Sequence, residues 1–159
     1  MEMELLFRLC ILFFPGRDPA AQPTEIMKTI LLIDDDESLR SGLRRTLVMM
    51  GGFKVLEAGR GQDVRKHLAN HSVDLIITDM LMPEEDGVET IIFLRKKLPD
   101  VPIIAISGGG RIKAEDCLKL ARGVGANITL AKPFSSAELL DAVKRTELGG
   151  GSVVSRVDK

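Results

Sequence analysis

The sequence predicts a three-layer α/β fold, in which a doubly wound, five-stranded parallel sheet lies between two layers of helices. Short apolar runs alternate with longer segments of helical period from residue 29 onward, and four of the five runs are continuously apolar. This alternation is typical of successive βαβ units. Strands without a polar face are typical of a sheet that helices cover on both sides. The length of 159 residues fits one such domain.

Five segments are expected to form the strands. The second segment is the weakest, because charged residues interrupt its apolar run, and we expect it at an edge of the sheet. The expected strands are residues 29–33, 54–58, 74–78, 102–106 and 128–131.

Five helices are expected between and after these strands. The first begins near Ser38 and ends at Gly51-Gly52, because glycine is a common helix stop. The third ends before Pro99, since the residue that precedes a proline disfavours helix. The apolar residues that mark the helices by their spacing are Leu39, Leu43, Leu47 and Met50; Val64 and Leu68; Val88, Ile91, Ile92 and Leu94; Leu118 and Ala121; and Leu139, Leu140 and Val143.

The two ends of the chain lack this alternation. Residues 5–14 are almost wholly apolar but too short to span a membrane, and an acidic start with an internal arginine disfavours a secretory signal. We interpret residues 1–27 as an N-terminal extension, of which the native protein lacks residues 1–26 if translation begins at Met27; a packed or partner-binding helix is the alternative. Residues 28–147 are then the domain, and residues 148–159 are expected to be a flexible tail.

Composition disfavours several classes of function. Acidic and basic residues nearly cancel, with a formal net charge of -1, so no overall field draws the chain to nucleic acid or anionic lipid. Cys10 and Cys117 lack metal-binding spacing, and His67 and His71 have no accompanying ligands and are expected at the surface. We therefore expect a cytoplasmic protein with free thiols and no nucleic acid or membrane partner.

Polar side chains follow four of the expected strands at their carboxyl ends. Asp34 and Asp35 come directly after the first strand, and Asp79 follows the third. Ser107 follows the fourth strand, and Lys132 follows the fifth. Because ligands of open α/β sheets bind at the carboxyl ends of the strands, we expect these side chains to lie close together.

This combination of groups predicts magnesium-dependent phosphoryl chemistry. Carboxylates a few ångströms apart repel one another by about 4 kcal/mol per close pair at an effective dielectric constant of about 20, so a cation must neutralise them. Oxygen ligands without histidine or cysteine favour Mg²⁺. Magnesium together with Lys132 favours phosphoryl transfer, and a carboxylate can attack phosphorus to form an acyl phosphate.

Two further acidic positions have structural interpretations. Asp36 or Glu37 is expected to cap the first helix, since acidic residues stabilise helix N-termini. Asp86-Gly87 is expected to form a turn and begin a helix without carrying chemistry.

The chain resembles the response regulator receiver domains of the CheY-like family over roughly residues 28–147. Four motifs carry the resemblance, each at the end of an expected strand and in family order, and together they are strong evidence. They are Asp34-Asp35, Asp79-Met-Leu-Met-Pro-Glu-Glu-Asp-Gly87, Ser107 and Lys132-Pro133-Phe134. The resemblance implies a flavodoxin-like sheet with the strand order 2-1-3-4-5.

The resemblance also implies a set of magnesium ligands. It makes Asp79 the phosphoacceptor and Asp35 a direct Mg²⁺ ligand. Asp34 would act largely through water, and the backbone carbonyl of Leu81 would complete the protein ligands. A sensor histidine kinase or a histidine phosphotransfer protein would supply the phosphoryl group, and the domain would at most catalyse its own phosphorylation and dephosphorylation.

Ser107 and Lys132 would link this chemistry to conformation. Each would contact a phosphoryl oxygen and move its loop in response, and the resemblance implies a cis peptide bond before Pro133. Thr129 stands where many receivers carry an aromatic residue, so the aromatic part of the usual switch is absent. Output onto a downstream protein is then expected through residues 108–113 and the fourth helix, or through another surface.

Three functions fit these residues to different degrees. The first is a single-domain response regulator, since no output domain follows residue 147 in this sequence. The second is a haloacid-dehalogenase-like phosphatase, because residues 34–39 resemble the Asp-x-Asp-x-Thr start of that family, but the acidic pair that it needs after the lysine is absent. The third is a phosphorylation-independent interaction module, which the complete acidic, hydroxyl and lysine set disfavours.

Overall fold

The computed structural model describes residues 28–82, 86–108 and 113–148. Within these ranges five parallel strands form one sheet in the order β2-β1-β3-β4-β5, which confirms the predicted fold class and strand order. The elements in chain order are β1 (Thr29–Ile33), α2 (Glu37–Gly51), β2 (Lys54–Ala58), α3 (Gly61–Asn70), β3 (Leu75–Asp79), α4 (Gly87–Lys97), β4 (Ile103–Ser107), α5 (Ala114–Gly123), β5 (Ile128–Ala131) and α6 (Ser136–Leu148).

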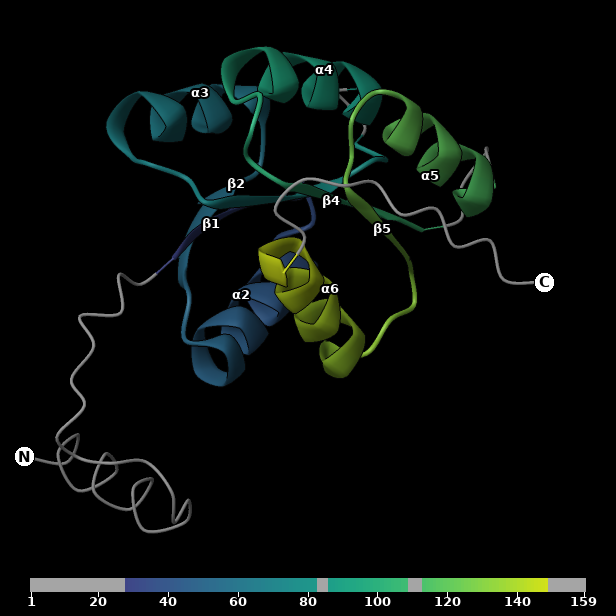
Figure 1. Ribbon diagram of the computed structural model, residues 1–159. Helices are drawn as coiled ribbons and strands as arrows, with labels where there is room; N and C mark the ends of the chain where they lie inside the picture. The colour runs from purple at the N-terminus through teal and green to yellow at the C-terminus, as the bar shows by residue number, and fades with distance from the viewer. Residues whose placement is uncertain (1–27, 83–85, 109–112, 149–159) are drawn as a thin grey trace, which may run out of the picture.

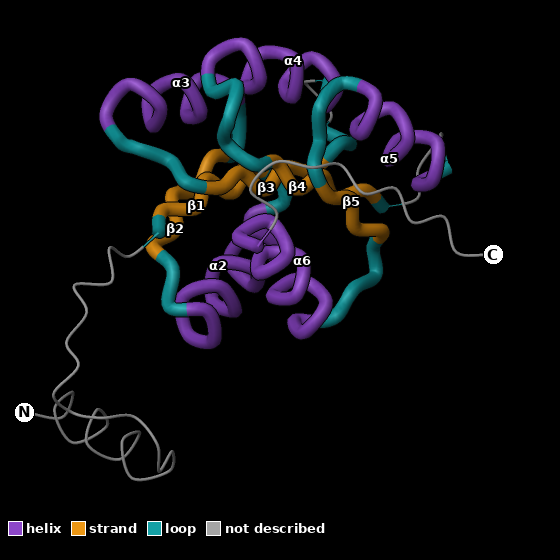
Figure 2. The backbone as a smooth tube through the Cα atoms, in the orientation of Figure 1, coloured by secondary structure: helices purple, strands orange, loops and turns teal. Residues whose placement is uncertain are grey.

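The sheet lies between two layers of helices (Figure 1). Helices α3, α4 and α5 cover one face, whereas α2 and α6 lie side by side on the other face, as Figure 2 also shows. Alternate residues of each strand point to opposite faces, so Leu31 and Ile33 pack in one core and Ile30 and Leu32 pack in the other. Burying each such leucine or isoleucine side chain stabilises the folded state by about 1.5–3 kcal/mol relative to leaving it exposed.

The predicted strand bounds are correct to within one residue. The bounds of β1, β2 and β5 match the prediction, whereas β3 and β4 both start and end one residue later than expected. The ladder reaches one residue past the predicted ends, because Asp79 pairs with Ile106 and Ser107 pairs with Ala131. Asp79 and Ser107 are therefore the last residues of rigid strands rather than the first residues of loops.

The central strands are more buried than the edge strands. All residues of β1, β3 and β4 are buried. The predicted edge position of β2 is confirmed, and its burial is intermittent, whereas β5 forms the other edge and is only partly buried. The polar groups at the ends of β1, β3 and β4 thus project from the most tightly packed part of the domain.

Helix α2 begins and ends at the predicted signals. Asp36 is its N-cap, and its carboxylate accepts the backbone N–H groups of Ser38 and Leu39. Gly52 is the C-cap in the left-handed conformation, with φ of 70°, which glycine adopts without steric cost. Capping by a side chain of this kind stabilises a helix by about 1 kcal/mol.

Two of the marker residues lie on exposed positions of their helices. Met50, in the last turn of α2, is 66% exposed. Ile92 of α4 is 39% exposed, whereas Ile91 beside it is fully buried, because successive helical residues are about 100° apart. The spacing therefore predicted the helices correctly but only part of the buried face.

The predicted surface position of both histidines is correct only for His71. His71 is exposed, but His67 is half-buried because the last turn of α3 packs against β2, and its Nε2 lies 2.9 Å from the carbonyl oxygen of Glu57. Cys117 is a free, buried thiol. Cys10 lies outside the described residues.

The expectations for the two ends of the chain fall largely outside the described residues. This applies to the predicted extension at residues 1–27, to the loop residues 109–112 and to residues 149–159, while Leu148 is the last residue of α6. Across the part of the chain that the structure describes, every helix is too short or too polar to cross a bilayer.

Candidate functional site

The end of β1 fixes a buried carboxylate at the rim of the sheet. The backbone N–H of Asp34 donates to the carbonyl of Ala58 at 3.1 Å. Its Oδ1 accepts the N–H of Asp36 at 2.9 Å. Asp34 is only 1% exposed, whereas the adjacent Asp35 is exposed. The loop therefore presents one carboxylate held against the sheet and a second that faces outward.

The end of β3 supplies a third carboxylate with two unlike oxygens. Oδ1 of Asp79 accepts the backbone N–H of Met80 at 2.7 Å, and the N–H of Leu81 lies 3.3 Å away. Oδ2 of Asp79 instead faces Lys132. These contacts fix the rotation of the carboxylate, so that one oxygen is held by the backbone and the other is directed toward the cation.

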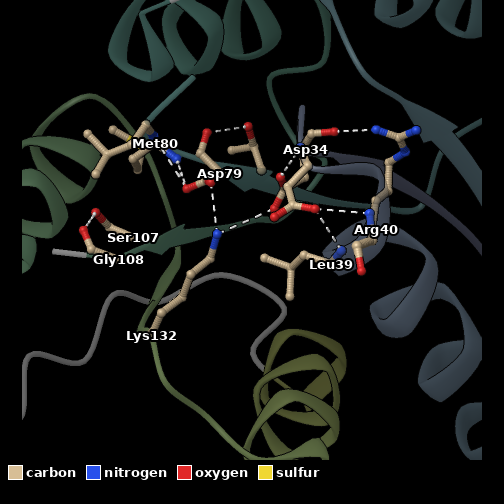
Figure 3. Close-up of polar contacts among 12 residues, drawn as sticks. Asp34, Leu39, Arg40, Asp79, Met80, Ser107, Gly108 and Lys132 are labelled. Carbon is tan, nitrogen blue, oxygen red and sulfur yellow. Dashed lines mark hydrogen bonds and ion pairs between the residues drawn. The ribbon is translucent and has the colours of Figure 1, made fainter. Parts of the chain in front are cut away.

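Lys132 spans the two buried carboxylates from the end of β5 (Figure 3). Its Nζ lies 2.8 Å from Oδ2 of Asp79 and 3.4 Å from Oδ2 of Asp34. Burial lowers the pKa of Lys132, but the two carboxylates outweigh this effect and the net pKa is raised. The lysine is therefore a fixed positive charge at the site. The peptide bond between Lys132 and Pro133 is cis, as the sequence resemblance implied.

The charge of Asp34 is only partly compensated by its neighbours. Burial raises the pKa of Asp34, and the N–H of Asp36 and the ammonium of Lys132 lower it by less, while Asp79 adds a further increase. The ionised form of this carboxyl group is thus destabilised relative to a carboxyl group in water. A further cation at the site would favour ionisation.

The three carboxylates can share one metal ion. Asp34, Asp35 and Asp79 each offer an oxygen, and these oxygens all lie within 4.8 Å of one another. Three carboxylates against the single ammonium of Lys132 leave 3 − 1 = 2 negative charges when all are ionised. An all-oxygen donor set with two uncompensated charges fits a hard divalent cation such as Mg²⁺.

Ser107 lies beside this cluster, but its hydroxyl forms no hydrogen bond with the described residues of the cluster. Its hydroxyl donates to the carbonyl oxygen of Gly108 at 3.2 Å (Figure 3), although the residue is fully buried at the end of β4. Of the residues predicted for the site, the structure brings together Asp34, Asp35, Asp79 and Lys132. The hydroxyl of Ser107 is turned toward its own loop.

The loop after Asp79 is closed by short-range contacts. Leu81 pairs with Asp86 in an isolated antiparallel bridge, and Asp86 caps α4 by accepting the N–H of Val88. A Cβ at Gly87 would lie 2.6 Å from Cα and O of Met80, closer than non-bonded atoms pack. The predicted structural role of Asp86-Gly87 is confirmed, because only glycine permits this approach.

One residue that sequence reasoning did not single out contacts the site. Nη1 of Arg40, on the first turn of α2, donates to the backbone carbonyl of Asp34 at 2.6 Å. Its position six residues after Asp34 gives a weak signal at most, since arginines on solvent-facing helices are common.

Comparison with known proteins decides the family. A family model described as response regulator receiver domain matches residues 30–144, more than half of the chain. The chain belongs to this family. Receiver domains are the signalling domains of two-component response regulators, and they bind Mg²⁺ at an acidic pocket that corresponds to the cluster of Asp34, Asp35 and Asp79.

Individual relatives agree with this assignment. The receiver is 34% identical over 140 residues to the transcriptional regulatory protein GltR of Pseudomonas aeruginosa, covering 82% of this chain and 56% of that protein. It is 36% identical over 118 residues to the transcriptional regulatory protein CpxR of Klebsiella pneumoniae, covering 74% of this chain and 48% of that protein. The chain spans about half of the length of these curated relatives.

Solved structures of receivers have the same fold. A response regulator receiver domain protein from Clostridium thermocellum superimposes with a TM-score of 0.67 at 30% identity, covering 76% of this chain and 94% of that chain. A CheY-like receiver domain protein from Methanospirillum hungatei gives a TM-score of 0.68 at 23% identity, covering 78% of this chain and 99% of that chain. At that lower identity the likeness concerns the fold alone.

Proposed function

We propose that this receiver accepts a phosphoryl group on Asp79 from the phosphohistidine of a sensor kinase or a phosphotransfer protein, in a magnesium-dependent reaction. The observation that carries the proposal is the position of Oδ2 of Asp79, which lies 2.8 Å from the ammonium of Lys132 and within the group of three carboxylates. A nucleophile, a fixed cation and a candidate metal site thus meet at one rim.

The unlike surroundings of the two oxygens of Asp79 support Oδ2 as the attacking atom. Two backbone N–H groups face Oδ1, whereas Oδ2 has the lysine as its partner. In the transfer, the bond from Oδ2 to phosphorus forms while the bond from phosphorus to the donor nitrogen breaks, and the imidazole keeps the electron pair. Lys132 would stabilise negative charge on the phosphoryl oxygens as they arrive.

Mg²⁺ would be held by Asp34, Asp35 and Asp79, with the backbone carbonyl of Leu81 completing the protein ligands. The ion would neutralise phosphoryl oxygens during transfer. The partly compensated charge of Asp34 supports a cation at this position.

Output is proposed to pass through altered protein–protein binding by the receiver. Ser107 would turn its hydroxyl from Gly108 to the phosphoryl group, a side-chain rotation at the end of β4. At the position of the usual aromatic residue, the hydroxyl of Thr129 accepts a hydrogen bond from Nε of Arg122 at 3.0 Å, which links β5 to α5. We propose a cytoplasmic signalling role with no nucleic acid bound by the receiver itself.

Acetyl phosphate, a small phosphoryl donor, tests the proposal. The full chain is incubated with Mg²⁺ and the donor, and intact mass is measured for a gain of one phosphoryl group that is stable in acid and labile in base. Asp79→Asn should abolish the gain. Asp74→Asn is the matched control, since Asp74 precedes β3 at the opposite end of the strand and its carboxylate binds the N–H of Thr29.

Three results would contradict the proposal. A phosphoryl adduct that persists in Asp79→Asn would place the acceptor elsewhere. An adduct that forms equally well after removal of divalent cations would refute the role of Mg²⁺. Continuous turnover of a phosphatase substrate that Asp34→Asn abolishes and Asp79→Asn retains would favour the haloacid-dehalogenase-like alternative.

A further inference from the structure

We propose that Arg40 is a positioning residue for the metal site, which sets the magnesium affinity of the receiver by holding the peptide group between Asp34 and Asp35. The inference rests on the proposed function, because it concerns the same site. It adds a residue outside the expected ligand set.

Among the described residues, the guanidinium of Arg40 has one hydrogen-bond partner and one ion-pair partner. Nη1 donates to the carbonyl oxygen of Asp34 at 2.6 Å, and Nε lies 3.4 Å from Oε1 of Glu57 on β2. Nε is buried and forms no hydrogen bond with the described residues. A Cβ at Gly59 would lie 3.2 Å from Nη1, so the absence of a side chain there leaves space for the guanidinium. The side chain is 16% exposed.

The contacted carbonyl belongs to the peptide group that precedes Asp35. Its orientation sets ψ of Asp34 and φ of Asp35, and so the direction in which the carboxylate of Asp35 leaves the backbone. The side chain of Asp35 is exposed and makes no hydrogen bond or ion pair with other described residues. Its position therefore depends on its backbone, which two side chains hold: the carboxylate of Asp34 accepts the N–H of Asp36, and Arg40 holds the peptide group between Asp34 and Asp35.

Arg40 and Arg44 form a natural pair for comparison. Both lie on α2, and Nε of Arg44 lies 3.2 Å from Oε2 of the same Glu57, but Arg44 is 52% exposed and forms no hydrogen bond with the described residues of the rim. Replacing either arginine by methionine removes one positive charge and one partner of Glu57. Only the Arg40 variant also removes the hydrogen bond to the carbonyl of Asp34.

A positioning role and a purely electrostatic role predict opposite results. Removing a cation near a divalent-metal site strengthens metal binding. Losing the group that orients a ligand weakens it, typically by about tenfold or more. We therefore expect Arg40→Met to weaken Mg²⁺ binding by about tenfold, and Arg44→Met to change it by less than about twofold.

The experiment measures Mg²⁺ binding directly by titration calorimetry on the full chain, with no phosphoryl donor present. A second measurement follows the initial rate of phosphorylation by acetyl phosphate against Mg²⁺ concentration. For Arg40→Met, the concentration that gives half of the maximal rate should rise by about tenfold, while the rate at saturating Mg²⁺ stays close to that of the wild type. A general loss of structure would lower the maximal rate instead.

The outcomes separate the two proposals. If the wild-type chain binds no Mg²⁺ at millimolar concentration, the proposed function fails and this inference fails with it. If the wild type binds Mg²⁺ but Arg40→Met binds it as tightly as Arg44→Met, or more tightly than the wild type, only the positioning role is refuted. Should Arg40→Met not fold by circular dichroism, Arg40→Lys against Arg44→Lys decides in the same way. Arg40→Lys keeps the charge, but a single ammonium replaces the separate Nη1 and Nε atoms that face Asp34 and Glu57, so weaker binding is expected in that variant alone.

Discussion

The ammonium of Lys132 lies 2.8 Å from Oδ2 of Asp79, the carboxylate oxygen that the backbone leaves available. The same ammonium lies 3.4 Å from Asp34. A metal ion held by Asp34 and Asp79 would therefore share these two carboxylates with a lysine that is already in place. The two cations compete for the carboxylates, although both would assist phosphoryl transfer.

Replacing Lys132 by methionine should therefore separate binding from chemistry. Removing the competing cation should tighten Mg²⁺ binding by about 1 kcal/mol, or roughly fivefold. Phosphorylation by acetyl phosphate should slow, because the positive charge that stabilises the phosphoryl oxygens during transfer is lost. Calorimetry and initial rates measure the two effects. Lys132→Arg, which keeps the charge, is the control, and unchanged affinity in Lys132→Met would contradict the competition.

Gly87→Ala should destabilise the domain. The added Cβ would lie 2.6 Å from the backbone of Met80, and overpacking of this kind costs about 1–3 kcal/mol. Gly42→Ala is the control, because a Cβ at Gly42 in the middle of α2 meets nothing within 4 Å, and alanine should stabilise that helix by about 0.5–1 kcal/mol. Urea denaturation of both variants measures these changes. Equal changes in the free energy of unfolding, with the same sign in both variants, would show that the contact with Met80 does not exclude a side chain at position 87.

Arg95→Met should lower stability by about 3 kcal/mol, because several acceptors would lose a charged donor. Burial lowers the pKa of Arg95, and Asp100 opposes this effect. The guanidinium donates to the carbonyl oxygens of Leu98, Pro99, Val101 and Gly125 and to Oδ1 of Asn127.

Arg122→Met serves as the control for Arg95→Met. Arg122 is exposed, and its side chain donates one hydrogen bond to Thr129, so the expected loss is within about 0.5 kcal/mol. Thermal and urea denaturation compare the two. If Arg95→Met lowered the free energy of unfolding as little as the control does, water would satisfy the oxygen acceptors of Arg95 as well as the guanidinium does.

The pH dependence of stability should contain a contribution from Glu138. Its carboxylate accepts hydrogen bonds from the backbone N–H and the hydroxyl of Ser135 at the start of α6, at 2.7 and 2.8 Å, which lowers the pKa of Glu138 below the ordinary value of 4.5. A lowered folded-state pKa gives a stabilisation that is complete above the unfolded value and is lost as pH falls through the folded value. The wild type should thus lose more stability than Glu138→Gln between about pH 6 and about pH 3. Superimposable thermal midpoints of the two proteins across that range would contradict this.

The fold and the acidic rim were predictable because the relevant signals are local. Apolar runs end abruptly in Asp34 and Asp79, and in parallel sheets the strand ends meet at one edge. The same logic placed Lys132 at the site. The carboxyl ends of β3 and β4 were placed one residue early because a sequence pattern does not show how far a ladder extends past the last apolar side chain.

The remaining features depend on tertiary contacts that no spacing encodes. Arg40 reaches the carbonyl of Asp34 because the turn after β1 brings the first turn of α2 beside the end of the strand. The hydroxyl of Ser107 could have faced Asp79 or its own loop, and the choice of Gly108 is a matter of side-chain rotation. His67 was expected at the surface, but the packing of α3 against β2 half-buries it.

The close approach of Gly87 to Met80 joins the start of α4 to the residue that follows Asp79. Since the neighbour at this contact is backbone, no flexible side chain lies between them to absorb a displacement. A shift of a few tenths of an ångström in the peptide after Asp79 would be passed directly to the first turn of α4. The first turn of α4 is therefore in backbone contact with the residue beside Asp79.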